Sequence, residues 1–316
     1  MSDNLKVVPK SITIFGASGR IGGPVARFIR KERPDIRLRL ATSSPQKRAA
    51  LEKEFPEAEV VVADYLDEAS MERALQNSEG IFLVTPNFLD EERAMAIFVR
   101  VAQRLPSLKH IVRILGDPPG MTLERVPKEL RDYKGGTAVQ HLHAKRVLDA
   151  ANLPITYINI AAYLMDNLIN MARLLREERK LIIPFDRLMA FVDPRDVGET
   201  AARLLLSDNH RHIGQYYHID NGHDVMRFSA VAQIMSEVIG EPVAYDGTGE
   251  AFVREFGPRY RERMKDERAG EYFLSYFKFE HDNETVWRRT DFCESILGRK
   301  PTTLKDWLTE HRSALF

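Results

Sequence analysis

The sequence predicts an α/β fold with a doubly wound parallel sheet and a small C-terminal lobe. Short apolar runs rich in β-branched residues alternate with helical patterns up to residue 115, as in a sheet whose strands are joined by helices. The first run leads directly into three regularly spaced glycines. The 316 residues are enough for one large α/β domain with an appended lobe, and no internal repeat suggests another architecture.

The first strand is expected at Ile12–Phe15, followed by Gly16, Gly19 and Gly22 and a helix to about Lys31. Glycine allows a tight turn and a close approach of the backbone to a pyrophosphate. The start of the helix then presents free N–H groups to that anion. This context predicts a dinucleotide-binding turn; a plain strand-to-helix connection is the alternative.

The second strand, residues 36–42, is followed by Thr42, Ser43, Ser44, Pro45, Gln46 and Lys47. In a dinucleotide fold this position meets the adenosine ribose, where an acidic residue would bind a free 2′-hydroxyl. Here hydroxyls and cations stand instead, which favours a 2′-phosphate and therefore NADP over NAD. Ser44 and Pro45 are also a good helix start, and both interpretations can hold.

Further strands are expected at 58–63, from Gly80 to a Thr85-Pro86-Asn87 end, and at 110–115, 155–160 and 215–220. Helices are expected at 45–54, 70–76, 90–104, 229–239 and 303–314. Three more are expected: one that begins at residue 137, one that ends at residue 179, and one that begins near Asp196 as its cap and ends at residue 206. The irregular segment 116–136 is typical of a lid or substrate loop. We expect residues 1–160 to form the nucleotide-binding domain, with 190–225 returning to it, and residues 161–189 and 226–316 to form the lobe.

Composition excludes several classes of protein. Lys and Arg together number 46, as do Asp and Glu, so bulk charge indicates neither nucleic acid nor an anionic membrane as partner. The single cysteine, Cys293, excludes an intramolecular disulfide and a cysteine-based zinc site. No apolar run approaches the length of a membrane span, so a cytoplasmic protein is expected. The His141/His143 and His210/His212 pairs lack a third ligand nearby, so no metal is expected.

Eight segments together resemble the NmrA-like branch of the atypical short-chain dehydrogenases/reductases, and they occur in the family's order through nearly the whole chain. The segments are Gly16–Gly22, Leu83–Pro86, Lys109–Arg113, His141–Lys145, Asn152–Tyr157, Tyr163–Leu168, Phe191–Gly198 and Ile296–Trp307. The resemblance implies a Rossmann domain that binds NAD(P)(H) and a small lobe, with the substrate between them. The family includes quinone reductases, reductases of natural-product biosynthesis and non-catalytic regulators that sense the redox state of the cofactor.

The resemblance also implies cofactor contacts by position. Those to the pyrophosphate are Gly16, Ser18, Gly19, Arg20, Ile21 and Gly22; those to the ribose phosphate are Thr42, Ser43 and Lys47; those to the adenine are Asp64 and Tyr65. Thr85, Pro86 and Asn87 would line the nicotinamide ribose, with Lys145, Ala162 and Tyr163 near the nicotinamide. From its place after the third strand alone, Asp64 could equally be a turn residue. Many relatives carry Arg where this chain has Ser43.

The catalytic position departs from the Tyr-x-x-x-Lys pair of short-chain dehydrogenases. His141 stands in the tyrosine position, as the NmrA-like branch often allows, while Lys145 replaces that branch's usual Glu. Histidine can act as a general acid near neutral pH, although a neighbouring lysine would lower its pKa and leave it neutral. Lys145 is therefore expected to bind the cofactor ribose first. His141 could also be an ordinary helix-surface residue, and Tyr133 and Tyr163 are alternative proton donors.

The expected function is an NAD(P)H-dependent oxidoreductase that reduces a carbonyl, a quinone or a conjugated double bond of a small, partly apolar molecule. The alternative is a non-catalytic NADP(H)-binding sensor that acts through a protein partner; a homodimer stays open. Aromatic residues near the C-terminus could form the core of the lobe, the favoured interpretation, or roof an apolar substrate pocket. They are Phe252, Phe256, Tyr260, Tyr272, Phe273, Tyr276, Phe277 and Phe279.

Overall fold

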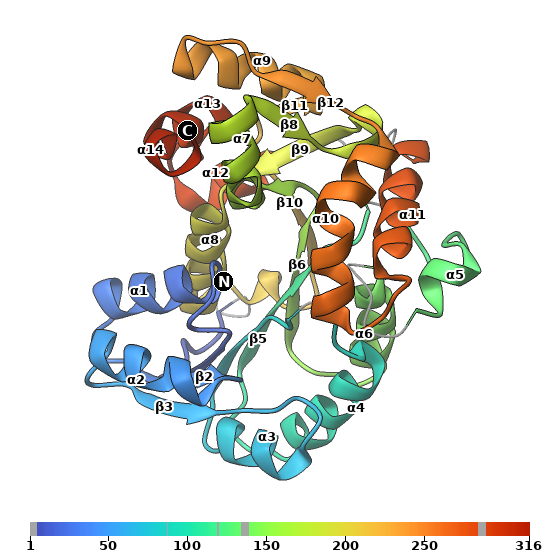
Figure 1. Ribbon diagram of the computed structural model, residues 1–316. Coiled ribbons are helices and arrows are strands. Elements are labelled where there is room, and N and C mark those ends of the chain that lie inside the picture. Colours follow the sequence, from blue (N-terminus) through green and yellow to red (C-terminus); the bar gives the residue numbers. More distant parts are fainter. Residues whose placement is uncertain (1–4, 87, 119, 134–138, 284–288) are drawn as a thin grey trace.

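The fold is built on a seven-stranded sheet in the order β10-β6-β5-β4-β1-β2-β3, in which all neighbours run parallel (Figure 1). It is seen in a computed structural model that describes residues 5–86, 88–118, 120–133, 139–283 and 289–316. The order reverses between β1 and β4, so the sheet has the switch point of a doubly wound fold, as predicted. The strands are β1 Ser11–Phe15, β2 Arg37–Thr42, β3 Glu59–Val62, β4 Gly80–Leu83, β5 His110–Leu115, β6 Ile155–Ile160 and β10 Tyr216–Ile219.

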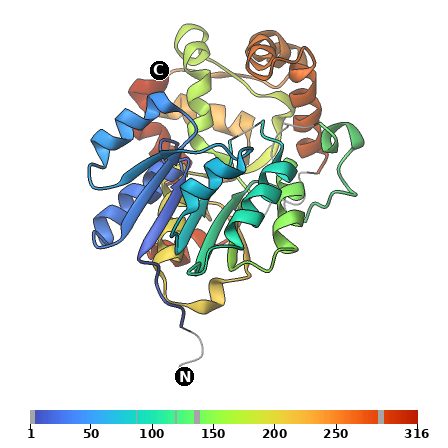
Figure 2. The same cartoon turned by 90° about the horizontal axis from the view of Figure 1, so that it is seen from below.

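Helices cover both faces of this sheet (Figure 2). One face carries α1 Gly22–Glu32, α2 Pro45–Glu54, α8 Pro194–Leu206 and α12 Phe292–Leu297; the other carries α3 Glu68–Leu75, α4 Glu91–Ala102 and α6 Gln140–Asp149. Each face has its own buried apolar cluster, because the strands are apolar on both sides. α1 and α8 pack closely at Gly198, where a Cβ would lie 2.6 Å from Pro24.

The lobe combines two short sheets with helices. The sheets have the orders β11-β9-β7 and β12-β8, and the lobe has an apolar cluster of its own. Its elements are β7 Tyr163–Leu164, η1 Met165–Met171, α7 Ala172–Glu178, β8 Lys180–Ile182, η2 Pro184–Asp186, β9 Leu188–Val192, β11 Val225–Arg227, α9 Phe228–Ile239, β12 Ala244–Asp246, α10 Gly249–Met264, α11 Ala269–Asp282, α13 Leu304–Glu310 and α14 Arg312–Leu315. All eight C-terminal aromatic residues belong to this cluster or pack against it, so the core interpretation is correct.

Several expectations from the sequence differ from the structure. The segment 116–136 includes a short helix, α5 Lys128–Arg131, and His210–His212 forms a single 3₁₀ turn, η3, just before β10. α8 is capped by Asp193 rather than by Asp196, because Pro194 begins the helix. α12 lies in the range expected for the lobe but packs on α8 and β10. Among the described residues, no helix has both the length and the apolar character needed to cross a bilayer.

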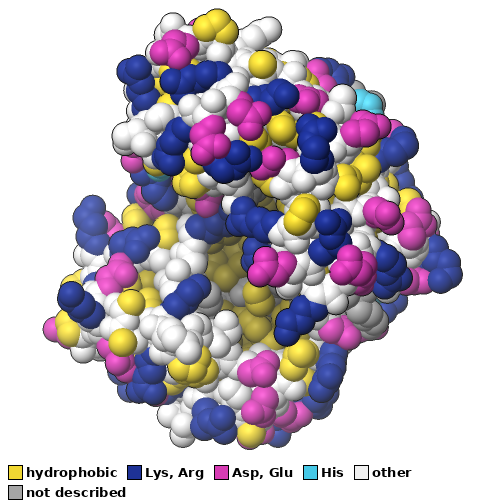
Figure 3. Space-filling view, in the orientation of Figure 1, with side chains coloured by type: hydrophobic (Ala, Val, Ile, Leu, Met, Phe, Trp, Pro, Cys, Tyr) yellow, Lys and Arg dark blue, Asp and Glu magenta, His cyan; other side chains and the backbone are white. Residues whose placement is uncertain are grey.

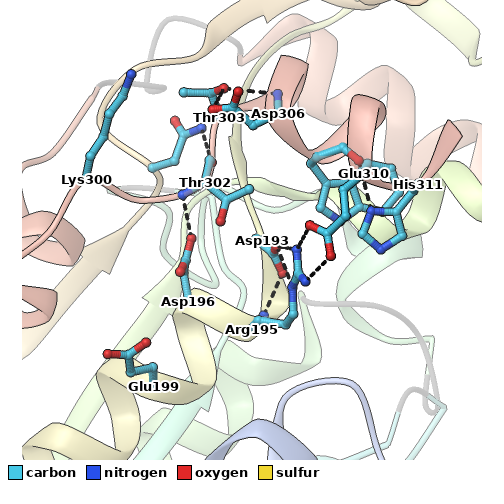
Figure 4. A network of polar contacts seen from close by, with 12 residues as sticks. Asp193, Arg195, Asp196, Glu199, Lys300, Thr302, Thr303, Asp306, Glu310 and His311 are labelled. Atoms are coloured by element: carbon cyan, nitrogen blue, oxygen red, sulfur yellow. Dashed lines mark hydrogen bonds and ion pairs between the residues drawn. The ribbon is translucent and has the colours of Figure 1, made fainter.

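A polar network ties the start of α8 to the closing segment of the chain (Figure 4). We call it the α8 network: Asp193, Arg195, Asp196, Arg299, Thr302 and Glu310. Arg195 bridges Asp193 and Glu310 at 2.6–2.9 Å, and Asp196 accepts the Thr302 N–H at 2.7 Å. The Phe191–Gly198 and Ile296–Trp307 motifs, far apart in sequence, therefore meet in space. Beside them the Cys293 thiol lies 3.6 Å from the Thr200 hydroxyl, fully buried.

Candidate functional site

The glycine turn after β1 is too tight to admit side chains at its three glycines. Gly16 has φ +64°, and a Cβ there would meet the Val84 side chain at 2.9 Å. A Cβ on Gly19 or Gly22 would lie 3.0 or 2.3 Å from the Gly16 carbonyl oxygen. α1 then begins with no side-chain cap and with no acidic residue in its first turn. A turn closed to side chains and a helix start without a carboxylate together fit a pyrophosphate.

The residues expected around the adenosine end lie at the carboxyl ends of β2 and β3. Ser18, Ser43 and Lys47 are exposed beside the turn, whereas Thr42 is buried and its hydroxyl accepts the Ser44 N–H at 3.3 Å. Asp64 is exposed and accepts the Leu66 N–H at 2.8 Å, as a turn residue does.

Tyr65, the second residue expected at the adenine, is turned inward. Its hydroxyl donates to the Val84 carbonyl at 2.8 Å, and its ring packs on Phe15, with 5.1 Å between the ring centroids. The structure thus leaves Ser43, Lys47 and Asp64 accessible to a ligand and uses Tyr65 to hold the end of β4.

Arg20 joins the glycine turn to the lobe. Its guanidinium donates to Asp166 Oδ1 at 3.0 Å and to Asn167 Oδ1 at 2.6 Å, both from the Tyr163–Leu168 motif. Burial raises the pKa of Asp166, against the effect of Arg20. Ala162 and Tyr163 precede this contact, and the Tyr163 ring packs against Phe191 and Phe228. The pyrophosphate turn and the lobe are therefore linked directly through a cation.

A buried polar group lies between β4, β5, α4 and α6. We call it the site network: Thr85, Glu91, Arg113 and His141. The Thr85 hydroxyl donates to Glu91, and Arg113 Nη2 donates to Thr85 Oγ1 at 3.0 Å and to Glu91 Oε2 at 2.9 Å. His141 Nε2 lies 3.5 Å from Glu91 Oε1. The side chains of Arg113 and Glu91 are 0% and 3% exposed, so the ion pair is shielded from water.

His141 is neutral in this environment. Burial and the charge of Arg113 lower its pKa to about 4, against the opposing effect of the Glu91 carboxylate. The neutral ring expected from the sequence is therefore present, but its main cause is burial. The Lys145 ammonium turns toward Asp149 at 2.5 Å, over the rings of Tyr157 and Tyr216. The structure does not bring it to His141, and a ribose contact would require it to leave Asp149.

Of the two alternative proton donors, Tyr133 is hydrogen-bonded and Tyr163 is packed among aromatic rings. The Tyr133 hydroxyl donates to Asp266 at 2.9 Å, and its ring stacks on Tyr272; burial and this bond raise its pKa to about 12. Burial raises the pKa of Tyr163. Pro86 is exposed next to Thr85, and Asn87 lies outside the described residues.

Glu91, Arg113 and Asp117 were not among the expected site residues. Arg113 interrupts the apolar strand β5, and a buried cation requires a counter-charge, which Glu91 in the first turn of α4 supplies. Asp117 follows β5, and both of its carboxyl oxygens are buried with no partner in the described part of the chain. Burial raises its pKa far above the usual range. Asn159 fixes its backbone N–H and carbonyl at 2.7 and 2.8 Å.

One face of the molecule carries a cleft. Figure 3 shows the molecule hollowed between the side of α1 and α2 and the side of α10 and α11, with hydrophobic side chains in the depth and Lys and Arg around the rim. Within the described part of the chain, no group of three or more His, Cys, Asp or Glu residues could hold a metal ion. The arrangement therefore offers an anion-binding turn, an apolar cleft and a neutral imidazole.

Comparison with known proteins shows the family of the chain. The model of the NmrA-like family matches residues 9–308. A curated relative, the (4-alkanoyl-5-oxo-2,5-dihydrofuran-3-yl)methyl phosphate reductase of Streptomyces griseus, is 25% identical over 311 residues, covering 96% of this chain and 98% of that protein. The chain therefore belongs to the NmrA-like family.

Solved structures show the same fold. The NADPH-dependent quinone oxidoreductase of Escherichia coli, complexed with NADPH, has a TM-score of 0.76 at 19% identity, covering 96% of this chain and 99% of that one. The Citrobacter sp. triphenylmethane reductase, complexed with NADP(H), has a TM-score of 0.75 at 20% identity, covering 95% and 99%. At these identities the likeness extends to the architecture, and the site must be argued from its own residues.

Proposed function

We propose that this member of the NmrA-like family is an NADP(H)-dependent oxidoreductase that reduces a carbonyl, a quinone or a conjugated double bond of a small, partly apolar molecule. The observation that carries the proposal is the position of the acid-free start of α1, which meets the sheet at its switch point, where such folds bind dinucleotides. The Streptomyces relative is named a reductase, and two structures of this fold are named as NADP(H) complexes.

The cofactor would be held by residues that the structure leaves free for it. Gly16, Gly19 and Gly22 allow the tight turn that would bring backbone N–H groups to the pyrophosphate, and Ser43 and Lys47 stand exposed where a 2′-phosphate would lie. When bound, the cofactor supplies a hydride, and the protein contributes orientation and exclusion of water. Thr85, at the end of β4, would face the nicotinamide ribose.

His141 would act on the substrate oxygen. A neutral ring carries one N–H. The Glu91 carboxylate, 3.5 Å from Nε2, favours the hydrogen on that nitrogen, and from there it can be donated to a substrate oxygen that gains negative charge. Tyr133 would first have to leave Asp266, and Tyr163 lies among aromatic rings, so both remain secondary candidates.

The test combines turnover with cofactor binding. NADPH oxidation with a panel of quinones and aldehydes should show turnover, and fluorescence titration should show tighter binding of NADP than of NAD. Lys47→Ala should weaken NADP binding about tenfold and leave NAD binding nearly unchanged. Lys53→Ala, at the exposed far end of α2, is the matched control. Tight NADP binding without turnover would favour a non-catalytic sensor, and a preference for NAD would refute the assignment of Ser43 and Lys47.

A further inference from the structure

We propose that the buried Glu91–Arg113 ion pair is the positioning device of the reductase site, which fixes the His141 ring and the Thr85 hydroxyl so that both act on one ligand. The inference rests on the proposed function and adds two residues to it. Neither touches the cofactor turn, and each acts through a neighbour: Glu91 through His141 Nε2, Arg113 through Glu91 and Thr85.

Stability alone does not account for this pair. Burying two charges costs several kcal/mol, and their mutual attraction returns that cost only when the remaining hydrogen-bonding groups are also satisfied. Among the described residues, Arg113 uses Nη2 alone, while its Nε and Nη1 are buried without a partner, as is His141 Nδ1. A pair placed for stability would have these donors satisfied.

Thr85 shows what the arrangement does to a group near the cofactor. A hydroxyl has one hydrogen to donate and two lone pairs to accept with. The hydrogen goes to Glu91, and one lone pair takes the Arg113 Nη2 hydrogen. The remaining lone pair makes Thr85 an acceptor only, so it is matched to a hydroxyl or amide donor of the ligand. Glu91 thereby orients Thr85 and His141 together.

The charges of Glu91 and Arg113 shift the pKa of His141, and this shift can be measured. The charged groups that face His141 from neighbouring elements are Glu91 on α4, whose negative charge raises its pKa, and Arg113 on β5, whose positive charge lowers it. On α6 itself, Lys145 is turned toward Asp149. Asp117, after β5, lies near Glu91 and Arg113, and burial raises the pKa of its carboxyl. Removing Glu91 or Arg113 alone should therefore move the titration of His141 in opposite directions.

The experiment uses the full chain and the variants Glu91→Gln, Arg113→Met and the double variant. Glu91→Gln should lower kcat about 10- to 100-fold and weaken NADPH binding much less, because the glycine turn is untouched and only the orientation of Thr85 is lost on the cofactor side. By NMR, His141 should titrate at lower pH in Glu91→Gln and at higher pH in Arg113→Met. The double variant removes both charges, so it should fold even where a single variant does not, while kcat stays as low as in Glu91→Gln.

Glu92→Gln is the matched control, because the adjacent Glu92 is half-exposed and bound to Arg146. It should leave kcat and the titration of His141 unchanged. A stable double variant with wild-type kcat and pH profile would reduce the pair to a structural role and overturn the proposal. An unmoved His141 titration in both single variants would do the same, and this readout needs no turnover. Absence of turnover in the wild type, with the predicted NMR shifts present, would instead count against the reductase function alone.

Discussion

The molecule contains two buried polar networks that look alike in composition and differ in completeness. In the α8 network, the buried carboxylates Asp193 and Asp196 are each held by an arginine and by a backbone N–H (Figure 4). In the site network, Arg113 and His141 keep buried nitrogen atoms that have no partner among the described residues. An unpaired buried polar group costs about 1–3 kcal/mol. The closed network ties the end of the chain to α8, and the proposed role of the open one is to position groups for a ligand.

Among variants that test the difference between the two networks, the largest expected effect is on turnover. His141→Ala should lower kcat about 100-fold or more, because the hydrogen-bond donor to the substrate oxygen is lost, with little change in melting temperature. His143→Ala is the matched control, since this ring lies on the same helix and contacts the Arg131 carbonyl at 3.2 Å. Steady-state kinetics with the best substrate of the panel checks both variants. An unchanged kcat in His141→Ala would remove the ring from the reaction.

Acid should destabilise the protein through the site network. The pKa of His141 is lowered from 6.5 to about 4 in the folded state, so below pH 6.5 the unfolded chain takes up the proton first. Its contribution is fully present above pH 6.5 and is lost as pH falls toward 4, by up to about 3 kcal/mol. Urea unfolding at several pH values measures this. His141→Asn should flatten the curve in part, because His110, with its pKa lowered to about 3, contributes in the same direction; an unchanged curve would contradict the assignment.

The α8 network should show the reverse pattern, with stability lost and turnover kept. Asp196→Ala removes the acceptor of the Thr302 N–H and of Arg299, at an expected cost of about 2–3 kcal/mol in the free energy of unfolding. Glu199→Ala, which removes a more exposed partner of the same arginine, should cost under about 1 kcal/mol. Denaturant unfolding and kcat measured side by side check this. A folded Asp196→Ala variant that had lost turnover would remove the distinction between the networks.

The smallest effect is a gain in stability at Asp117. Its raised pKa means that the folded chain keeps a proton that the unfolded chain releases near pH 3.8, so this residue costs stability as pH rises above that value. Asp117→Asn should therefore be more stable than the wild type at pH 7, by about 1 kcal/mol, and equal to it near pH 3.8. Thermal unfolding at both pH values measures the difference. A destabilised variant at pH 7 would show that the carboxylate is charged and bound.

Local patterns were enough to predict the sheet and the glycine turn. β1, β4, β5 and β6 are apolar runs that stay buried on both sides, and that character is visible without tertiary information. β2, β3 and β10 are partly exposed and were recognised from alternation or β-branched and aromatic content. β7, β8, β11 and β12 were missed, because strands of two or three residues carry too little periodicity, and β9 was missed because its end was interpreted as the approach to the following helix. The aromatic residues of α10 and α11 were correctly assigned to the lobe core because of their number alone.

The site was predicted less completely, for a physical reason. His141 follows from its spacing to Lys145, but the contact with Glu91 joins residues 50 positions apart on different helices, and no local pattern encodes it. The orientation of Lys145 toward Asp149 likewise depends on the neighbouring rings of Tyr157 and Tyr216. The charge of Arg113 inside an apolar strand is the one sequence signal that could have indicated a buried counter-charge such as Glu91.

The single cysteine is a natural probe of local opening in this molecule. Cys293 sits in α12 against Thr200 of α8, fully buried, and burial raises the pKa of its thiol to about 12. Thiol reagents attack the exposed thiolate, so they cannot react until α12 leaves the sheet. The rate of thiol labelling in native buffer therefore measures how often α12 separates from α8. The chain has no other thiol, so no engineered probe is needed.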